Sequence, residues 1–120
     1  MPILYVIATP IGNLEDVSLR ALRLLKEVKL IAAEDTRKTR HLLSAYDIKT
    51  SLTSYHEHSR RAKVNYLLDY LEREDLALVS EAGMPGLSDP GYELIVAAIE
   101  RGVSVVPVPG ASAVITALAV

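Results

Sequence analysis

Five short apolar runs alternate with amphipathic stretches along this chain. Each run has four to six residues, the length of a buried strand, and the runs cover 3–8, 30–33, 51–55, 76–79 and 103–108. Strands that alternate with helices usually fold as a parallel sheet with right-handed crossovers and helices on both faces. The sequence therefore predicts an α/β fold: a five-stranded, mainly parallel sheet flanked by helices.

The segments between these runs carry helix signals. Apolar residues recur at helical spacing, which predicts helices at about 17–28, 36–46, 60–73 and 92–101 and a last helix from 111. Asn13 and Asp16 resemble a capping pair for the first helix. Gly102 is well placed to follow the fourth helix in a left-handed conformation. On the third helix, the spacing of Tyr66 and Tyr70 favours packing over a stacking platform.

Composition limits the class of protein. The 120 residues suffice for one domain, which we expect to be the N-terminal domain of a longer chain. The absence of cysteine excludes disulfides and thiolate metal sites. No apolar run approaches membrane-span length, so we expect a cytoplasmic protein without a membrane partner. The net charge of −2 is unlike that of a stand-alone nucleic-acid binder, so any RNA contact must come from local patches.

A loop rich in glycine and proline follows the fourth apolar run. It holds two carboxylates, Glu81 and Asp89, and leads directly into a helical pattern at Tyr92. In parallel sheets, ligands bind beyond the carboxyl ends of the strands, so the turns after the first, fourth and fifth runs should share one edge. A tight connection without any ligand is the competing interpretation, because glycine and proline mark turns in general.

These turns do not suit a phosphate. Neither the first nor the fourth turn contains lysine or arginine, and neither a P-loop motif nor a dinucleotide-binding motif is present. Carboxylates, backbone carbonyls and apolar side chains suit a ligand that is cationic or neutral. S-adenosylmethionine, a sulfonium nucleoside, has this character.

Five motifs resemble one known family. In chain order they are IATPIGNLEDVSLRAL, IAAEDTRKTRHLL, SYHEHS, LVSEAGMPGLSDPGY and VVPVPGASAVITAL. Together they resemble the N-terminal domain of the ribosomal RNA methyltransferases in the tetrapyrrole methylase superfamily. The resemblance implies an S-adenosylmethionine-dependent enzyme that 2′-O-methylates a cytidine ribose in the decoding region of 16S ribosomal RNA. It also implies a two-domain fold with the cofactor between the domains, the small ribosomal subunit as partner, and a homodimer.

The resemblance also implies where the cofactor binds. Carried over by position, the cofactor-binding residues are Pro10, Gly83, Met84, Leu87, Ser112 and Ala113. This chain departs from the family pattern by having Glu81 for Asp, Met84 for Thr and Ala111 for Pro. The change at Glu81 keeps the charge, whereas the change at Met84 removes a hydroxyl from the presumed cofactor loop.

Candidate catalytic groups are Glu34, Asp35 and Glu81. A ribose hydroxyl is a weak nucleophile, so a carboxylate could act as a base or an orienting group. The alternative for Asp35 is an N-cap, since it precedes a helix. Among the histidines, His56 could contact RNA or pass protons, although a structural role is equally compatible. No metal is expected.

Two basic groups could meet RNA phosphates. We favour Arg37 and Arg40 as RNA-binding residues, because EDTR lies at the expected ligand edge. The second group, Arg60, Arg61 and Lys63, fits a solvated helix face. Two other functions stay open: a tetrapyrrole-type small-molecule methylase, and an isolated domain that pairs with itself and has no activity.

Overall fold

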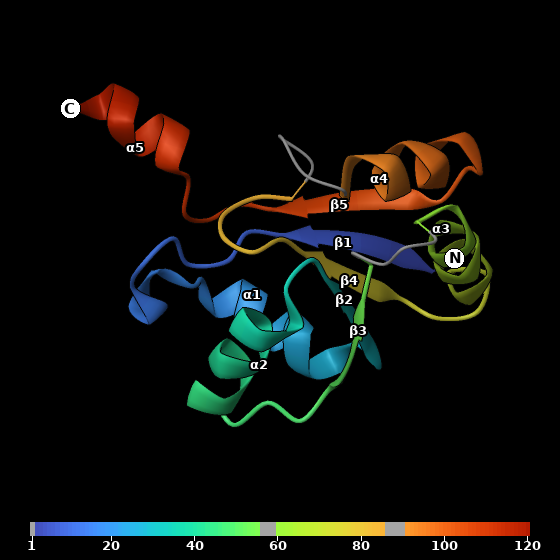
Figure 1. Ribbon diagram of the computed structural model, residues 1–120, viewed down its shortest axis with the longest axis horizontal. Coiled ribbons are helices and arrows are strands. Elements are labelled where there is room, and N and C mark those ends of the chain that lie inside the picture. The colour runs from blue at the N-terminus through green and yellow to red at the C-terminus, as the bar shows by residue number, and fades with distance from the viewer. Residues whose placement is uncertain (1, 56–59, 86–90) are drawn as a thin grey trace.

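All five expected strands form one parallel sheet. The computed structural model describes residues 2–55, 60–85 and 91–120. The strands are β1 (Ile3–Ile7), β2 (Leu30–Ala33), β3 (Ser51–Ser54), β4 (Leu76–Val79) and β5 (Ser104–Val108). Their order in the sheet is β3-β2-β4-β1-β5, and every pairing is parallel (Figure 1). The predicted fold class is confirmed.

Helices cover both faces of the sheet. The helices are α1 (Leu19–Glu27), α2 (Thr36–Ala45), α3 (Arg60–Tyr70), α4 (Gly91–Glu100) and α5 (Ala113–Ala119). Buried side chains of α1 and α2 pack on one face in a cluster that includes Ile7 and Val79. Those of α3 and α4 pack on the other face with Leu4 and Leu78. The exception is α5, which projects away from the sheet (Figure 1).

The alternation of side chains along β4 explains why this strand lies at the centre. All four of its residues are buried. Ala77 and Val79 join the α1/α2 cluster, while Leu76 and Leu78 join the α3/α4 cluster. A strand with both faces covered reads as a continuous apolar run, as this one does in the sequence.

Two local predictions were wrong. Asn13 caps only a short 3-10 turn, η1 (Leu14–Asp16), by accepting a hydrogen bond from the Glu15 amide. Ser18 is the N-cap of α1, and its hydroxyl accepts from the Ala21 amide at 3.0 Å. The helix therefore starts later than the apolar spacing suggested. The prediction of packing holds for Tyr70, which lies against the α3/α4 cluster, but not for Tyr66, which is 54% exposed with the Lys63 ammonium 5.3 Å from its ring centre.

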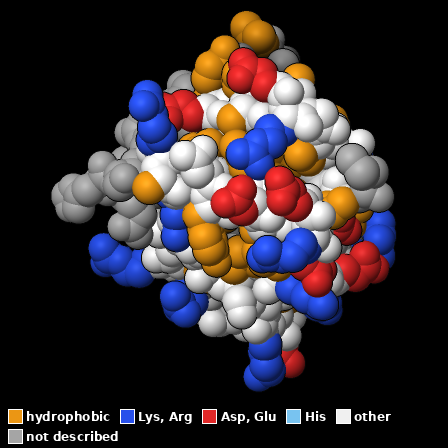
Figure 2. Space-filling view, turned by 90° about the vertical axis from the view of Figure 1, so that its right-hand side faces the viewer, with side chains coloured by type: hydrophobic (Ala, Val, Ile, Leu, Met, Phe, Trp, Pro, Cys, Tyr) orange, Lys and Arg blue, Asp and Glu red, His pale blue; other side chains and the backbone are white. Residues whose placement is uncertain are grey.

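Exposed ion pairs lie along the amino-terminal edge of the sheet. Lys29 pairs with Glu74 at 3.1 Å, and Arg101 lies 3.4 Å from both Asp69 and Glu72. Figure 2 views the molecule from this side and shows acidic and basic side chains interspersed. Among the described residues, no helix has the length and apolar character needed to cross a bilayer.

The turns after β1, β4 and β5 meet at the carboxyl edge. Thr9 and Gly83 form an antiparallel bridge, with N–H···O distances of 3.0 and 2.9 Å. A Cβ added at Gly110 would lie 3.1 Å from the Ala8 methyl, so the turn after β5 packs directly on the end of β1. The predicted convergence of the three turns is confirmed.

Candidate functional site

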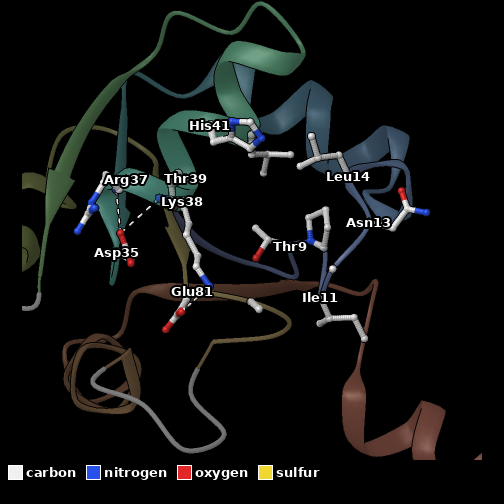
Figure 3. A pocket seen from close by; sticks show the side chains of 14 residues that line it. Thr9, Ile11, Asn13, Leu14, Asp35, Arg37, Lys38, Thr39, His41 and Glu81 are labelled. Atoms are coloured by element: carbon white, nitrogen blue, oxygen red, sulfur yellow. Dashed lines mark hydrogen bonds and ion pairs between the residues drawn. The ribbon is translucent and has the colours of Figure 1, made fainter.

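A groove of about 680 Å³ opens at this edge, on the side of the sheet covered by α2. Its walls come from the turn after β1, the first half of α2 and the turn after β4 (Figure 3). The lining residues are Thr9, Pro10, Ile11, Gly12, Asn13, Leu14, Asp35, Arg37, Lys38, Thr39, His41, Leu42, Glu81 and Ala82. Three segments that are distant in the sequence therefore build one site.

Asp35 holds the first turn of α2 in place. Its carboxylate accepts hydrogen bonds from the amides of Arg37 at 2.9 Å and Lys38 at 3.3 Å. These contacts satisfy amides that the helix itself cannot pair, and the negative charge complements the helix dipole. The N-cap interpretation of Asp35 is thus confirmed. The cap orients α2 so that Lys38 and His41 line the groove.

Glu81 is held from two sides. The Glu34 carboxylate accepts a hydrogen bond from the Glu81 amide at 3.0 Å, which ties the turn after β4 to the end of β2. The Glu81 carboxylate lies 2.6 Å from the Lys38 ammonium (Figure 3). This hydrogen bond, together with the negative charge of Glu81, raises the pKa of Lys38 above its ordinary value. The pair joins α2 to the β4 turn.

The base of the groove carries a buried hydroxyl. Thr9 is only 5% exposed, and its Oγ1 has no hydrogen-bond partner among the described residues. Thr9 follows Ile7 by two residues in extended chain, so its side chain lies on the α1/α2 side of the sheet. Figure 3 shows it between the Lys38–Glu81 pair and the turn that contains Ile11.

The groove brings together residues that the sequence predicts for cofactor binding, for catalysis and for RNA binding. Pro10, Asp35, Arg37 and Glu81 line it, whereas Arg40 is exposed away from its walls. Glu34 contacts the groove through its hydrogen bond to the Glu81 amide.

The other predicted cofactor residues do not line this groove. Gly83 is buried in the bridge to Thr9, and the half-buried Met84 packs against the α3/α4 cluster. Ser112 is half-buried in the turn before α5, and its carbonyl accepts from the Thr116 amide. His56 and Leu87 lie outside the described residues, as does the side chain of Ala113.

The carboxyl-edge turns have the chemistry that a sulfonium nucleoside requires. Segments 8–13, 80–85 and 108–112 contain no lysine or arginine, so they offer backbone groups, small side chains and one carboxylate. Gly83 has φ +76°, a conformation that favours glycine, and it lets the turn after β4 pass close to Ile11 and Ala111. These residues fit S-adenosylmethionine better than a pyrophosphate.

Sequence reasoning overlooked part of the groove. Thr9, Lys38 and His41 line the groove but are not among the site residues that the sequence predicts. Lys38 could have been predicted as a site residue, because an N-cap at Asp35 places it in the first turn of a helix at the ligand edge of the sheet. No sequence signal pointed to the unpaired hydroxyl of Thr9.

The family of this chain follows from its match to a model of known family sequences. Residues 3–120 match the model of the tetrapyrrole (corrin/porphyrin) methylases. The chain belongs to the tetrapyrrole methylase family.

Three curated relatives are at least half identical in sequence to this chain over the aligned residues. The chain is 60% identical over 116 residues to a protein of Halalkalibacterium halodurans and 52% identical over 119 residues to one of Synechocystis. A Bacillus subtilis protein is 50% identical over 119 residues. Each is named ribosomal RNA small subunit methyltransferase I. The matches cover 96–98% of this chain but only 40–43% of these relatives, so the chain spans less than half of their length.

Solved structures support the fold of this family. Uroporphyrin-III-C-methyltransferase from Thermus thermophilus superposes with a TM-score of 0.74 at 22% identity, covering 92% of this chain and 48% of that one. Diphthine synthase gives a TM-score of 0.73 at 16% identity, covering 92% of this chain and 45% of that one. At such identities the likeness concerns the fold alone.

Proposed function

We propose that this tetrapyrrole methylase chain is the N-terminal, cofactor-binding domain of an S-adenosylmethionine-dependent methyltransferase that acts on 16S ribosomal RNA. The proposal rests on one observation: two surfaces of different charge lie next to each other at the carboxyl edge of the sheet. The turns after β1, β4 and β5 are free of cations, whereas the α2 wall beside them carries Arg37, Lys38 and His41. The first suits a sulfonium and the second suits a polyanion. The names of the relatives point in the same direction.

The reaction is 2′-O-methylation of a cytidine ribose in the decoding region. S-adenosylmethionine would supply the methyl group. In the part of the site that the structure describes, the cofactor would be held by Pro10, Gly83, Met84 and Ser112. The proposed set of cofactor-binding residues is completed by Leu87 and Ala113. Because methyl transfer requires in-line approach, the main task of the chain is to position the ribose oxygen.

Glu81 is the best-placed carboxylate for that task. It lines the groove and is half exposed, and its backbone and side chain are held by Glu34 and Lys38. Glu34 and Asp35 are engaged in fixing the β4 turn and the α2 terminus. We therefore assign to Glu81 the contact with the ribose, and to Glu34 and Asp35 the role of positioning residues.

The proposal extends to the assembly. We infer a cytoplasmic homodimer in which a second domain completes the cofactor site, and the small ribosomal subunit as partner. Calorimetry with S-adenosylmethionine on the 120-residue chain and on a longer protein containing it tests the two-domain part. Binding should be weak for the former and strong for the latter; equally strong binding would contradict it. Light scattering of the longer protein should give the mass of a dimer.

A second candidate is a methylase of tetrapyrrole-type small molecules. The cations of the α2 wall would also suit the carboxylates of a porphyrinoid, and this observation keeps the candidate open. Methyl transfer from labelled S-adenosylmethionine to small-subunit RNA and to porphyrinoid substrates, assayed side by side, separates the two. Labelling of RNA alone is expected, and labelling of the porphyrinoid alone would overturn the proposal.

Arg37→Ala tests the RNA-facing wall. In the full-length protein it should weaken RNA binding about tenfold or less and flatten the salt dependence, while cofactor binding stays unchanged. Lys49→Ala is the matched control, because Lys49 pairs with Asp47 on an exposed turn away from the groove. Equal loss of RNA and cofactor binding in Arg37→Ala would refute the assignment.

A further inference from the structure

Within residues 2–55, 60–85 and 91–120, the hydroxyl of Thr9 has no hydrogen-bond partner although its residue is buried. The backbone of Thr9 is fully used, since its N–H and C=O both bond to Gly83. Ser80, in the neighbouring turn and 3% exposed, makes a useful comparison: its hydroxyl lies 3.1 Å from the Ala82 carbonyl and 3.3 Å from that of Gly83. Buried polar groups in folded proteins are almost always paired. Thr9 is one of the residues that line the groove, so a ligand that reaches its hydroxyl from there can supply the missing bond.

The surroundings of Thr9 define the chemistry of this ligand. A threonine hydroxyl both donates and accepts, and so it matches another hydroxyl. Arg37, Lys38 and His41 on the adjacent wall suit backbone phosphates. A ribonucleotide combines phosphates with a 2′-hydroxyl, the group by which proteins distinguish RNA from DNA. Resting on the proposed function, we propose that Thr9 hydrogen-bonds the ribose of the target nucleotide and makes the groove selective for ribose over deoxyribose.

The contact requires part of the groove wall to move, because Thr9 Oγ1 is shielded from solvent. The Lys38–Glu81 pair lines the same groove as Thr9, and its side chains are 61% and 50% exposed (Figure 3). Exposed ion pairs contribute little stability and exchange partners readily. An RNA phosphate therefore competes with Glu81 for Lys38, and the wall beside Thr9 opens as the nucleotide enters. The Glu81 carboxylate is then free to face the ribose.

Thr9→Val removes the hydroxyl while keeping the branched shape. The measurement is the affinity of the full-length protein for a decoding-region RNA oligonucleotide, and for the same oligonucleotide with 2′-deoxycytidine at the target. The wild type should bind the all-ribose oligonucleotide about tenfold more tightly. Thr9→Val should bind both with the same, weaker affinity. It should melt at the same or a higher temperature, because an unpaired buried hydroxyl is removed.

Thr50→Val is the matched control. The Thr50 hydroxyl donates to the Leu25 carbonyl at 2.6 Å, away from the groove. This variant should show the opposite pattern, with a lower melting temperature and an unchanged preference for ribose. A paired threonine contributes to stability, whereas a ligand-facing one contributes to binding.

Three results would overturn the inference. If Thr9→Val keeps the tenfold preference while the wild type methylates the RNA, Thr9 is not the group that contacts the ribose, and the proposed function stands. If Thr9→Val lowers the melting temperature as Thr50→Val does, the hydroxyl has a structural partner. If the wild type neither binds nor methylates the RNA, the proposed function fails, and the role of Thr9 fails with it.

Discussion

At the residue scale, the candidate site depends on side chains that organise other groups. Asp35 pairs amides of α2, Glu34 fixes the Glu81 amide, and Lys38 pairs with the Glu81 carboxylate. Of these residues, Glu34, Asp35 and Glu81 were the catalytic candidates in the sequence. The two acidic residues at the end of β2 thus each accept hydrogen bonds from backbone amides.

Asp35→Ala should lower the free energy of unfolding by about 1 kcal/mol, because two amides of α2 lose their partner. Asp35→Asn should cost much less, since an amide oxygen can still accept. Urea unfolding of the three proteins measures this. A large loss in Asp35→Asn would mean that the charge of Asp35, and not its cap, stabilises the domain.

Lys38→Gln should change how the free energy of unfolding depends on pH in alkaline solution. The pKa of Lys38 is raised in the folded state above its ordinary 10.5, so the stabilising contribution of the pair is complete below that pH. It is lost as the pH rises through the higher folded-state pKa. In urea unfolding at a series of pH values, the wild type should lose stability above about pH 10 more steeply than Lys38→Gln. Parallel curves would show that the pair does not contribute.

At the scale of elements, the site depends on three turns that touch. The turn after β4 bridges to β1 at Thr9 and Gly83, and the turn after β5 packs on Ala8 through Gly110. Parallel pairing of β4, β1 and β5 brings their carboxyl ends together, and small residues then allow close approach.

Gly110→Ala tests this contact. The new methyl would lie 3.1 Å from the Ala8 methyl, so the turn must shift, at a cost of about 1–3 kcal/mol. Adding Ala8→Gly should restore part of the loss, because it removes the atom in the way. The double-mutant cycle, measured by thermal unfolding, should give a coupling energy of about 1 kcal/mol. Additive effects would show that the two turns move independently.

At the scale of the whole molecule, stability is concentrated in the central strands. Leu78 is completely buried on β4, between β2 and β1, while Leu52 is half-buried on the edge strand β3. Leu78→Ala should cost about 2–5 kcal/mol, through lost burial and the cavity that remains. Leu52→Ala should cost less than half as much in the same urea titration. Equal losses would contradict this distribution.

The fold class could be predicted from the sequence, because the periodicities of strands and helices are local properties of the chain. The strands at Leu30–Ala33 and Leu76–Val79 have the predicted bounds, since a short apolar run between turn residues has few alternatives. Boundaries set by side-chain capping were less predictable: Ser18, and not Asn13, starts α1. The carboxyl-edge location of the site also followed from the sequence, through the general rule for parallel sheets.

Which side chains share the groove could not be predicted from the sequence, because it depends on contacts between distant segments. Lys38 and Glu81 are distant in the chain and meet because β2 and β4 are neighbours in the sheet. The unpaired state of the Thr9 hydroxyl is a property of everything packed around it, and no local pattern encodes it. The periodicity of apolar residues indicates how one segment folds. The pairing of polar groups depends on contacts between segments, so it could not be predicted in the same way.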